Sequence, residues 1–149
     1  MMAIYLLDTN ILLRSADDAS PQHVQAKEAV AMLLAKENAC YLTGQVLIEF
    51  WAVATRPVVA NGLGWDVLKT TAEIDRLCMQ FPMLDEVPGV FLHWQTLVTS
   101  HDIKGKRVHD VRLLAVMKVH GATHLLTLNP RDFPEVDGIR IVEPRTVLH

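Results

Sequence analysis

Short apolar segments alternate with longer amphipathic segments along this chain. The short segments have the length and the apolar or β-branched character of strands that lie inside a sheet. Each is followed by polar or turn-forming residues, as expected where a strand leaves the core. We predict strands at residues 4–7, 40–43, 83–87, 124–128 and 139–142.

The longer segments carry apolar residues at helical spacing. Ser20 followed by Pro21 is typical of a helix N-terminus, and Gly121 is typical of a helix C-terminus. Residues 45–55 are apolar on nearly every side, which predicts a deeply buried helix. We predict helices after Pro21 and at residues 45–55, 65–80, 90–101 and 110–120.

This alternation predicts a three-layer α/β domain with a mainly parallel central sheet flanked by helices. A chain of 149 residues fits one domain, residues 1–149, and half of its residues are hydrophobic, which is enough for a packed core. In such sheets ligands collect outside the carboxyl ends of the strands. Polar residues at those ends are therefore the candidates for a functional site.

Charge and composition narrow the class of protein further. Fourteen Lys and Arg against 17 Asp and Glu give a net charge of −3, which argues against non-specific electrostatic binding of nucleic acid over the whole surface. An enzyme whose bound cations bridge to phosphate is still compatible with that charge. No apolar run approaches the roughly 18–20 residues that span a bilayer, and the N-terminus lacks a basic signal segment. Cys40 and Cys78 do not have the spacing of a metal site, so we expect a cytoplasmic protein without a membrane anchor.

Two carboxylates are associated with apolar segments: one directly follows a predicted strand, and the other lies within a predicted helix. Asp8 directly follows the strand predicted at residues 4–7, although Asp is also common there as a turn or capping residue. Glu49 has apolar neighbours in the helix predicted at residues 45–55. It lies either on a narrow exposed strip or beside a charged partner, because an unpaired buried charge costs several kcal/mol.

Two more oxygen-bearing side chains stand at such edges. Asp110 opens an apolar helix, where an acid also complements the helix dipole. Asn129 follows the last-but-one strand and precedes a proline, which is common in turns, and Asp132 lies three residues further on. If the elements pack as one sheet with flanking helices, these side chains converge.

Three converging carboxylates repel one another unless a cation lies between them. A ligand set made only of oxygen atoms favours Mg²⁺ or Mn²⁺ over Zn²⁺. The residues thus predict a divalent metal site formed by Asp8, Glu49 and Asp110. Such a cation acidifies a water molecule and stabilises charge on a phosphate, which requires no catalytic histidine.

The ordered set of motifs resembles the PIN-domain nucleases, and among them the VapC-type toxins of type II toxin–antitoxin pairs. The resemblance is carried by residues 7–14, 48–50, 108–115 and 126–133, and it extends over nearly the whole chain. It implies a PIN-like fold and a divalent-metal-dependent endoribonuclease that leaves 5′-phosphate and 3′-hydroxyl ends. It also implies a homodimer and neutralisation by a small antitoxin that covers the site.

The resemblance assigns roles within the site. It makes Asp8, Glu49 and Asp110 the first three acids and puts the family's fourth acidic position on Asn129, whose neutral amide is a weaker ligand. Thr127 corresponds to a hydroxyl residue that orients a water or a metal ligand. Whether one or two metals bind, and whether Asp132 compensates for Asn129, is left open. Basic residues that are candidates for contacts with RNA phosphates, each also explicable as solvated surface, are Arg14, Lys104, Lys106, Arg107 and Arg112.

Three other classes of protein are alternatives to a nuclease. The acidic balance and Asn129 are compatible with a PIN scaffold that binds RNA or protein without cutting it. A phosphoacceptor receiver domain needs paired acids after the first strand and a lysine after a late one, and neither is present. A phosphatase with an Asp-x-Asp motif is disfavoured because Asn10 stands at the second position.

Overall fold

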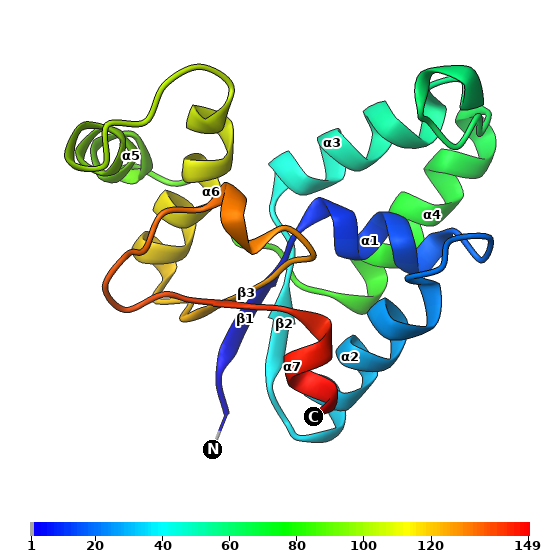
Figure 1. Ribbon diagram of the computed structural model, residues 1–149, viewed down its shortest axis with the longest axis horizontal. Coiled ribbons are helices and arrows are strands. Elements are labelled where there is room, and N and C mark those ends of the chain that lie inside the picture. The colour runs from blue at the N-terminus through cyan, green and yellow to red at the C-terminus, as the bar shows by residue number, and fades with distance from the viewer. Residues whose placement is uncertain (1) are drawn as a thin grey trace.

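The centre of the molecule is a four-stranded parallel sheet in the order β2-β1-β3-β4 (Figure 1). The computed structural model describes residues 2–149. The two central strands are the most apolar, and Leu6, Leu7, Leu125 and Leu126 have no exposed surface. The strands are β1 (Ile4–Leu7), β2 (Ala39–Tyr41), β3 (His124–Leu126) and β4 (Arg140–Val142). The prediction of a parallel α/β architecture is confirmed.

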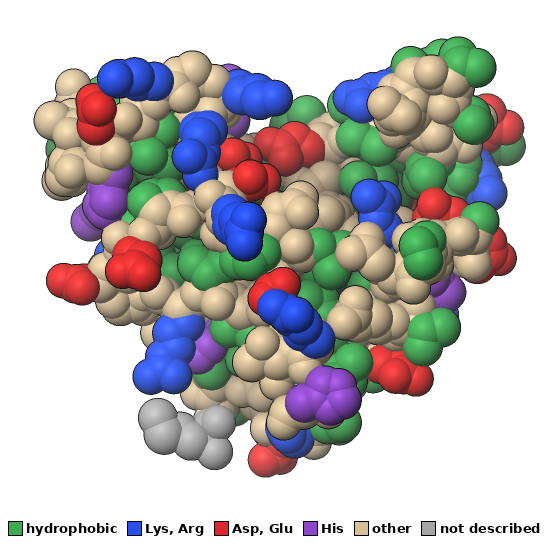
Figure 2. Space-filling model, in the orientation of Figure 1, with side chains coloured by type: hydrophobic (Ala, Val, Ile, Leu, Met, Phe, Trp, Pro, Cys, Tyr) green, Lys and Arg blue, Asp and Glu red, His purple; other side chains and the backbone are tan. Residues whose placement is uncertain are grey.

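Helices cover both faces of the sheet. Figure 1 shows α5 and α6 on one side and α1, α2 and α7 on the other, with α3 and α4 projecting beyond the sheet. A notch between α3 and α6, lined by Glu49 and Asp110 among others, lies at the edge where the strands end (Figure 2). The helices are α1 (Thr9–Ala16), α2 (His23–Ala35), α3 (Gly44–Thr55), α4 (Val67–Gln80), α5 (Val90–Ser100), α6 (Arg107–His120) and α7 (Pro144–Leu148), with short 3-10 turns η1 (Val58–Ala60) and η2 (Pro130–Asp132).

The helix α1 was not predicted, and neither was α7. Asp8 ends β1 and caps α1, since its side chain accepts a hydrogen bond from the backbone N–H of Thr9. Only eight residues long, α1 is too short for periodicity to reveal it, and its burial of Ile11, Leu12 and Leu13 supplies its stability. The immediate change from strand to helix places the buried Asp8 at the carboxyl edge of the sheet.

Two predicted elements are wrong in part. Residues 83–87 form no strand, because only Met83 pairs, in a single bridge with Leu42, before the chain turns away at Pro88 and Gly89. The second difference is at the start of α2, which begins at His23. Ser20 instead closes a turn by accepting a hydrogen bond of 3.1 Å from the backbone N–H of Gln22.

The helix α3 is less deeply buried than predicted. Thr43 caps it by accepting a hydrogen bond from Val46 N, and Val46 and Phe50 are completely buried. Ile48 on the opposite face is 72% exposed. The helix α6 also begins at Arg107 rather than at residue 110, which places Asp110 within its first turn. Among residues 2–149, no helix has the length and apolar character needed to cross a bilayer.

Candidate active site

Acidic side chains gather at the carboxyl edge of the sheet. Asp8 follows β1 directly, Thr127 follows β3, and the notch above them lies between α3 and α6. Figure 2 shows acidic side chains at the base of this notch and basic side chains around it. The fold thus brings polar groups together at the edge where parallel α/β sheets bind their ligands.

Asp8 is a buried carboxylate held by a network of donors. Its Oδ1 accepts a hydrogen bond of 2.8 Å from the backbone N–H of Thr9, and its Oδ2 accepts one of 2.7 Å from the Thr127 hydroxyl. Burial raises the pKa of Asp8, the two hydrogen bonds oppose that rise, and the charges of Glu49 and Asp132 add to it. The pKa of Asp8 therefore depends on the charges of two other acids of the site.

Asn10 joins the ends of the two central strands. Its side-chain amide nitrogen lies 3.3 Å from Asp8 Oδ2 and 3.2 Å from Thr127 Oγ1, and its oxygen accepts a hydrogen bond from the backbone N–H of Leu128. The sequence analysis gave Asn10 no role in the site. The signal available in the sequence was its place two residues after Asp8, within the motif at residues 7–14.

Glu49 extends from α3 toward Asp8. Its Oε2 accepts a hydrogen bond of 2.9 Å from the hydroxyl of Thr9, which is the neighbour of Asp8. Its Oε1 accepts another of 2.9 Å from the side-chain amide of Gln45. Glu49 is partly buried, and its interactions are with polar groups of the notch rather than with solvent on the outer face of α3.

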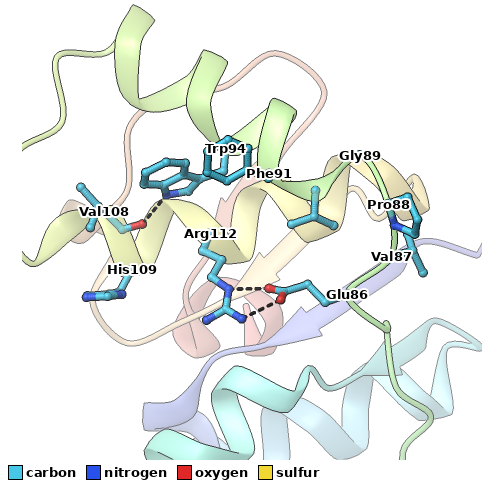
Figure 3. A pocket seen from close by; sticks show the side chains of 10 residues that line it. Glu86, Val87, Pro88, Gly89, Phe91, Trp94, Val108, His109 and Arg112 are labelled. Carbon is cyan, nitrogen blue, oxygen red and sulfur yellow. Dashed lines mark hydrogen bonds and ion pairs between the residues drawn. The ribbon is translucent and has the colours of Figure 1, made fainter.

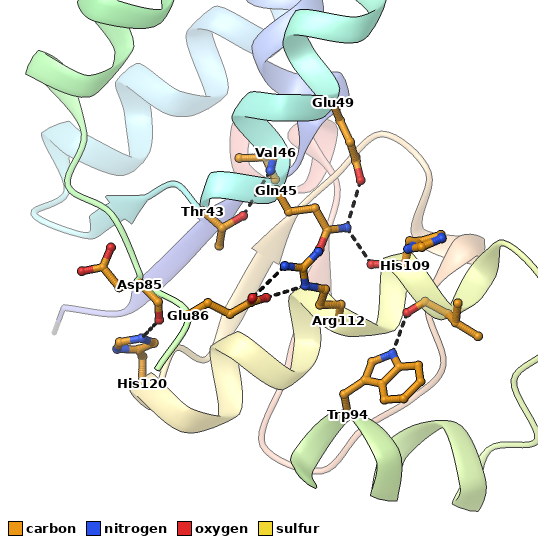
Figure 4. A network of polar contacts seen from close by, with 11 residues as sticks. Thr43, Gln45, Val46, Glu49, Asp85, Glu86, Trp94, His109, Arg112 and His120 are labelled. Atoms are coloured by element: carbon orange, nitrogen blue, oxygen red, sulfur yellow. Dashed lines mark hydrogen bonds and ion pairs between the residues drawn. The ribbon is translucent and has the colours of Figure 1, made fainter. Parts of the chain in front are cut away.

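Gln45 connects the two helices that border the notch. Its Nε2 donates to Glu49 and, at 2.7 Å, to the backbone carbonyl of His109 on α6 (Figure 4). Both neighbours are acceptors, so the amide orientation is determined by them. Its buried Oε1 has no hydrogen-bond partner among residues 2–149. The sequence analysis did not identify Gln45 as part of the site.

Asp110 lies in the first turn of α6 beside the same acids. Its pKa is raised to about 6: burial is the largest cause, the charges of Asp132, Asp8 and Glu49 add to the rise, and the charge of Arg107 opposes it. A carboxyl group at the start of a helix normally has a lowered pKa because of the helix dipole. The opposite shift shows that burial, together with the negative charges of three other acids, outweighs the helix dipole at Asp110.

Asp132, rather than Asn129, faces this group. A pocket of about 670 Å³, here called the acidic pocket, is lined by Glu49, Lys106, Arg107, His109, Asp110, Arg131 and Asp132. Asn129 does not line it, and its side chain makes no hydrogen bond with residues 2–149; only its backbone N–H donates, to Thr127 Oγ1 at 3.0 Å. The turn η2 carries Asp132 toward the notch.

The basic candidates separate into two groups. Lys106 and Arg107 line the acidic pocket, together with Arg131, which the sequence analysis did not select. The others do not line it. Arg14 is bonded to Gln22, Lys104 to Asp102 and Arg112 to Glu86.

The donor set suits a hard divalent cation. Its acids offer only oxygen atoms, and their mutual repulsion is visible in the raised pKa of Asp110. Within residues 2–149, however, no three acidic, histidine or cysteine side chains are already arranged around one point at which an ion would sit. The oxygens of Asp8 and Glu49 are instead engaged with Thr9, Thr127 and Gln45.

Comparison with known proteins assigns the family. The model of the PIN domain matches residues 5–139, which is most of the chain and includes every acid of the notch. The chain therefore belongs to the PIN-domain family, as the motifs indicated.

Curated relatives and solved structures agree with this assignment. The chain is 28% identical to Ribonuclease VapC48 of Mycobacterium tuberculosis over 138 residues, 92% of this chain and 94% of that one. The fold is similar to that of VapBC2 from Rickettsia felis bound to a promoter DNA fragment, with a TM-score of 0.67, 19% identity and coverage of 94% and 98%. It is also similar to VapC20 of Mycobacterium tuberculosis, a toxin that cleaves the sarcin–ricin loop, with a TM-score of 0.61, 19% identity and coverage of 81% and 86%.

Proposed function

We propose that this protein, as one PIN domain over residues 1–149, is a metal-dependent endoribonuclease and the toxin of a toxin–antitoxin pair. The observation that carries the proposal is the meeting of Asp8, Glu49, Asp110 and Asp132 at one notch, where each raises the pKa of a neighbour or lines the same pocket. Relatives that are named ribonucleases support RNA as the substrate.

Asp8, Glu49, Asp110 and Asp132 would hold Mg²⁺ or Mn²⁺. When bound, the cation supplies positive charge that acidifies water and stabilises the phosphate during hydrolysis. In the reaction a water oxygen forms a bond to phosphorus, the bond from phosphorus to the 3′-oxygen breaks, and the 3′-oxygen takes up a proton. We place Asp132 at the position that the resemblance gave to Asn129, because Asp132 is the residue that lines the acidic pocket.

The remaining residues of the notch orient the acids and the substrate. Thr127 and Asn10 hold the carboxylate of Asp8, which reduces its freedom to turn away from the notch. Lys106, Arg107 and Arg131 lie on the wall of the acidic pocket and would contact phosphates on either side of the bond that is cut. This local positive rim offsets the net charge of −3 where RNA must approach.

The partner that we propose is an antitoxin, and the assembly is a homodimer. Similar folds occur in VapBC complexes from Rickettsia felis, Salmonella typhimurium and Haemophilus influenzae, in which a VapC toxin is combined with a VapB protein. A toxin that acts on RNA and is held by such a partner would operate in the cytoplasm, the compartment predicted from the sequence.

The test is cleavage of a labelled single-stranded RNA by purified protein. We expect cleavage with Mg²⁺ or Mn²⁺, none with EDTA, and a rate reduced about a hundredfold in Asp110→Asn. The matched control is Asp75→Asn, which removes an exposed carboxylate on α4, far from the notch in the fold, and leaves the rate unchanged.

Equal activity in Asp110→Asn and wild type would show that the notch is not the catalytic site. Tight RNA binding without cleavage in any divalent metal would instead favour a PIN scaffold that binds RNA without cutting it.

A further inference from the structure

A second pocket adjoins the acidic pocket. It has a volume of about 460 Å³ and lies between the first turns of α5 and α6 (Figure 3). We call it the aromatic pocket, and its lining consists of residues 86–91 with Trp94, Val108, His109 and Arg112. The sequence analysis and the comparisons give it no role.

Two aromatic rings form one wall of this pocket. Phe91 and Trp94 have ring centroids 5.5 Å apart at an interplanar angle of 32°. The indole N–H of Trp94 donates a hydrogen bond of 2.8 Å to the carbonyl of Val108, which fixes the ring between α5 and α6. Phe91 is 64% exposed, whereas α5 buries Val90 and Leu97 for its packing. Packing in the core therefore does not account for the position of Phe91.

A neutralised ion pair forms the opposite side. The guanidinium of Arg112 donates two hydrogen bonds to the carboxylate of Glu86, one of them 2.7 Å long, and both side chains are only partly exposed (Figure 3). The positive charge of Arg112 is thus matched, which makes the pocket a poor site for a phosphate. The planar pair still offers hydrogen-bonding groups at its edges, as an uncharged planar ligand requires.

The two pockets share one residue. His109 lines both of them, and it immediately precedes Asp110 in the first turn of α6. Figure 4 shows His109 between the Gln45–Glu49 contact on one side and Trp94 on the other. A nucleotide whose phosphate lies among the acids therefore has its own base, or that of its neighbour, within the reach of the aromatic pocket.

We propose that the aromatic pocket binds one unstacked base of the RNA next to the phosphate that is cut, with Phe91 as a specificity-determining residue. The inference rests on the proposed function. Proteins recognise single-stranded RNA by stacking its bases on aromatic rings and by hydrogen bonds to their edges. Stacking also supplies affinity that does not depend on charge, which suits a chain with a net charge of −3.

The experiment compares Phe91→Ala with Leu92→Ala. Leu92 is the next residue of α5, is 67% exposed and lies outside the pocket lining, so it controls for the loss of an exposed apolar side chain. The substrate is a short RNA with one cleavage site, prepared intact and with an abasic residue on either side of the scissile bond. We expect Phe91→Ala to raise KM about tenfold with little change in kcat, and Leu92→Ala to change neither.

The abasic substrates decide whether the ring acts on a base. At one of the two positions the abasic residue should raise KM for wild type about as much as Phe91→Ala does on intact RNA. With that substrate Phe91→Ala should cause no further loss, because the contact is already absent. An equal loss on intact and abasic RNA, or equal behaviour of the two variants, would overturn the proposal.

Two further measurements separate other outcomes. Binding of the same RNA to Asp110→Asn, with and without Phe91→Ala, tests the pocket even if wild type cuts no RNA. Weaker binding only with Phe91→Ala supports the base site, whereas absence of cleavage by wild type refutes the nuclease alone. Light scattering of Phe91→Ala and Leu92→Ala measures the oligomeric state of each variant. It tests whether a second copy of the chain binds at this face. A loss of dimer in Phe91→Ala with unchanged RNA binding would show that the pocket is a self-association surface.

Discussion

The hydroxyl of Thr127 donates a hydrogen bond of 2.7 Å to Oδ2 of Asp8, and the two residues are 119 positions apart in the sequence. The bond joins the carboxyl ends of β1 and β3, the central strands of the sheet. Thr127 has no exposed surface, and its oxygen also accepts hydrogen bonds from Asn10 and from the backbone N–H of Asn129. One buried hydroxyl therefore positions an acid of the site and the turn that leads to Asp132.

Thr127→Val should impair both stability and catalysis. Valine preserves the shape but leaves Oδ2 of the buried Asp8 without its hydroxyl donor, which costs about 2–3 kcal/mol of unfolding free energy. It also removes an interaction that lowers the pKa of Asp8. Urea unfolding and RNA cleavage measure the two effects. Thr127→Ser keeps the hydroxyl and should recover most of the activity; failure of serine to do better than valine would argue against the hydrogen bond.

The free energy of unfolding without metal should depend on the ionisation of Asp110. The pKa of this group is raised to about 6, above its value in the unfolded chain, so the folded protein binds the proton more tightly. The contribution of Asp110 to stability is consequently greatest in acid and declines as pH rises from about 4 to about 6. Because the group is only partly buried and solvent screens it, we expect an effect of about 1 kcal/mol.

The measurement is urea unfolding of wild type and Asp110→Asn in EDTA. Asparagine cannot ionise, so the stability of the variant relative to wild type should increase between pH 4 and pH 7. Saturating Mg²⁺ should abolish this advantage. A difference that stays constant with pH would mean that folding does not raise the pKa of Asp110.

Gln45→Met should weaken metal binding more than it weakens the fold. Methionine has a similar length but cannot donate to Glu49 and to the carbonyl of His109, so α3 and α6 lose their direct polar connection. We expect the affinity for Mn²⁺, measured by calorimetry, to fall about tenfold. Gln95→Met changes an exposed glutamine of α5 and is the control. Unchanged affinity in Gln45→Met would assign Gln45 a packing role alone.

Asp132→Asn and Asn129→Ala distinguish the two candidates for the fourth acidic position. Asp132 lines the acidic pocket and raises the pKa of Asp8 and Asp110, whereas Asn129 does not line it. Asp132→Asn should therefore reduce Mn²⁺ affinity and cleavage by about 10- to 100-fold. Asn129→Ala should change either by less than about threefold. The reverse ranking would return the position to Asn129.

The architecture and most of the acids were predictable from the order of residues along the chain. Apolar periodicity is a local property, so β1, α5 and the C-terminal end of α6 at Gly121 could be predicted from short stretches. Asp8 and Asp110 were identifiable because each stands at the edge of such a stretch. The short helix α1 escaped prediction because tertiary burial, not periodicity, stabilises it.

Which polar groups meet depends on the packing of distant segments. Asn10 and Thr127 touch across 117 positions, and Gln45 reaches His109 across 64. The choice of Asp132 over Asn129 depends on the turn of η2, and the exposure of Phe91 depends on how α5 rests on α6. Contacts between distant segments follow from how whole elements pack. The local sequence around each contacting residue does not predict that packing.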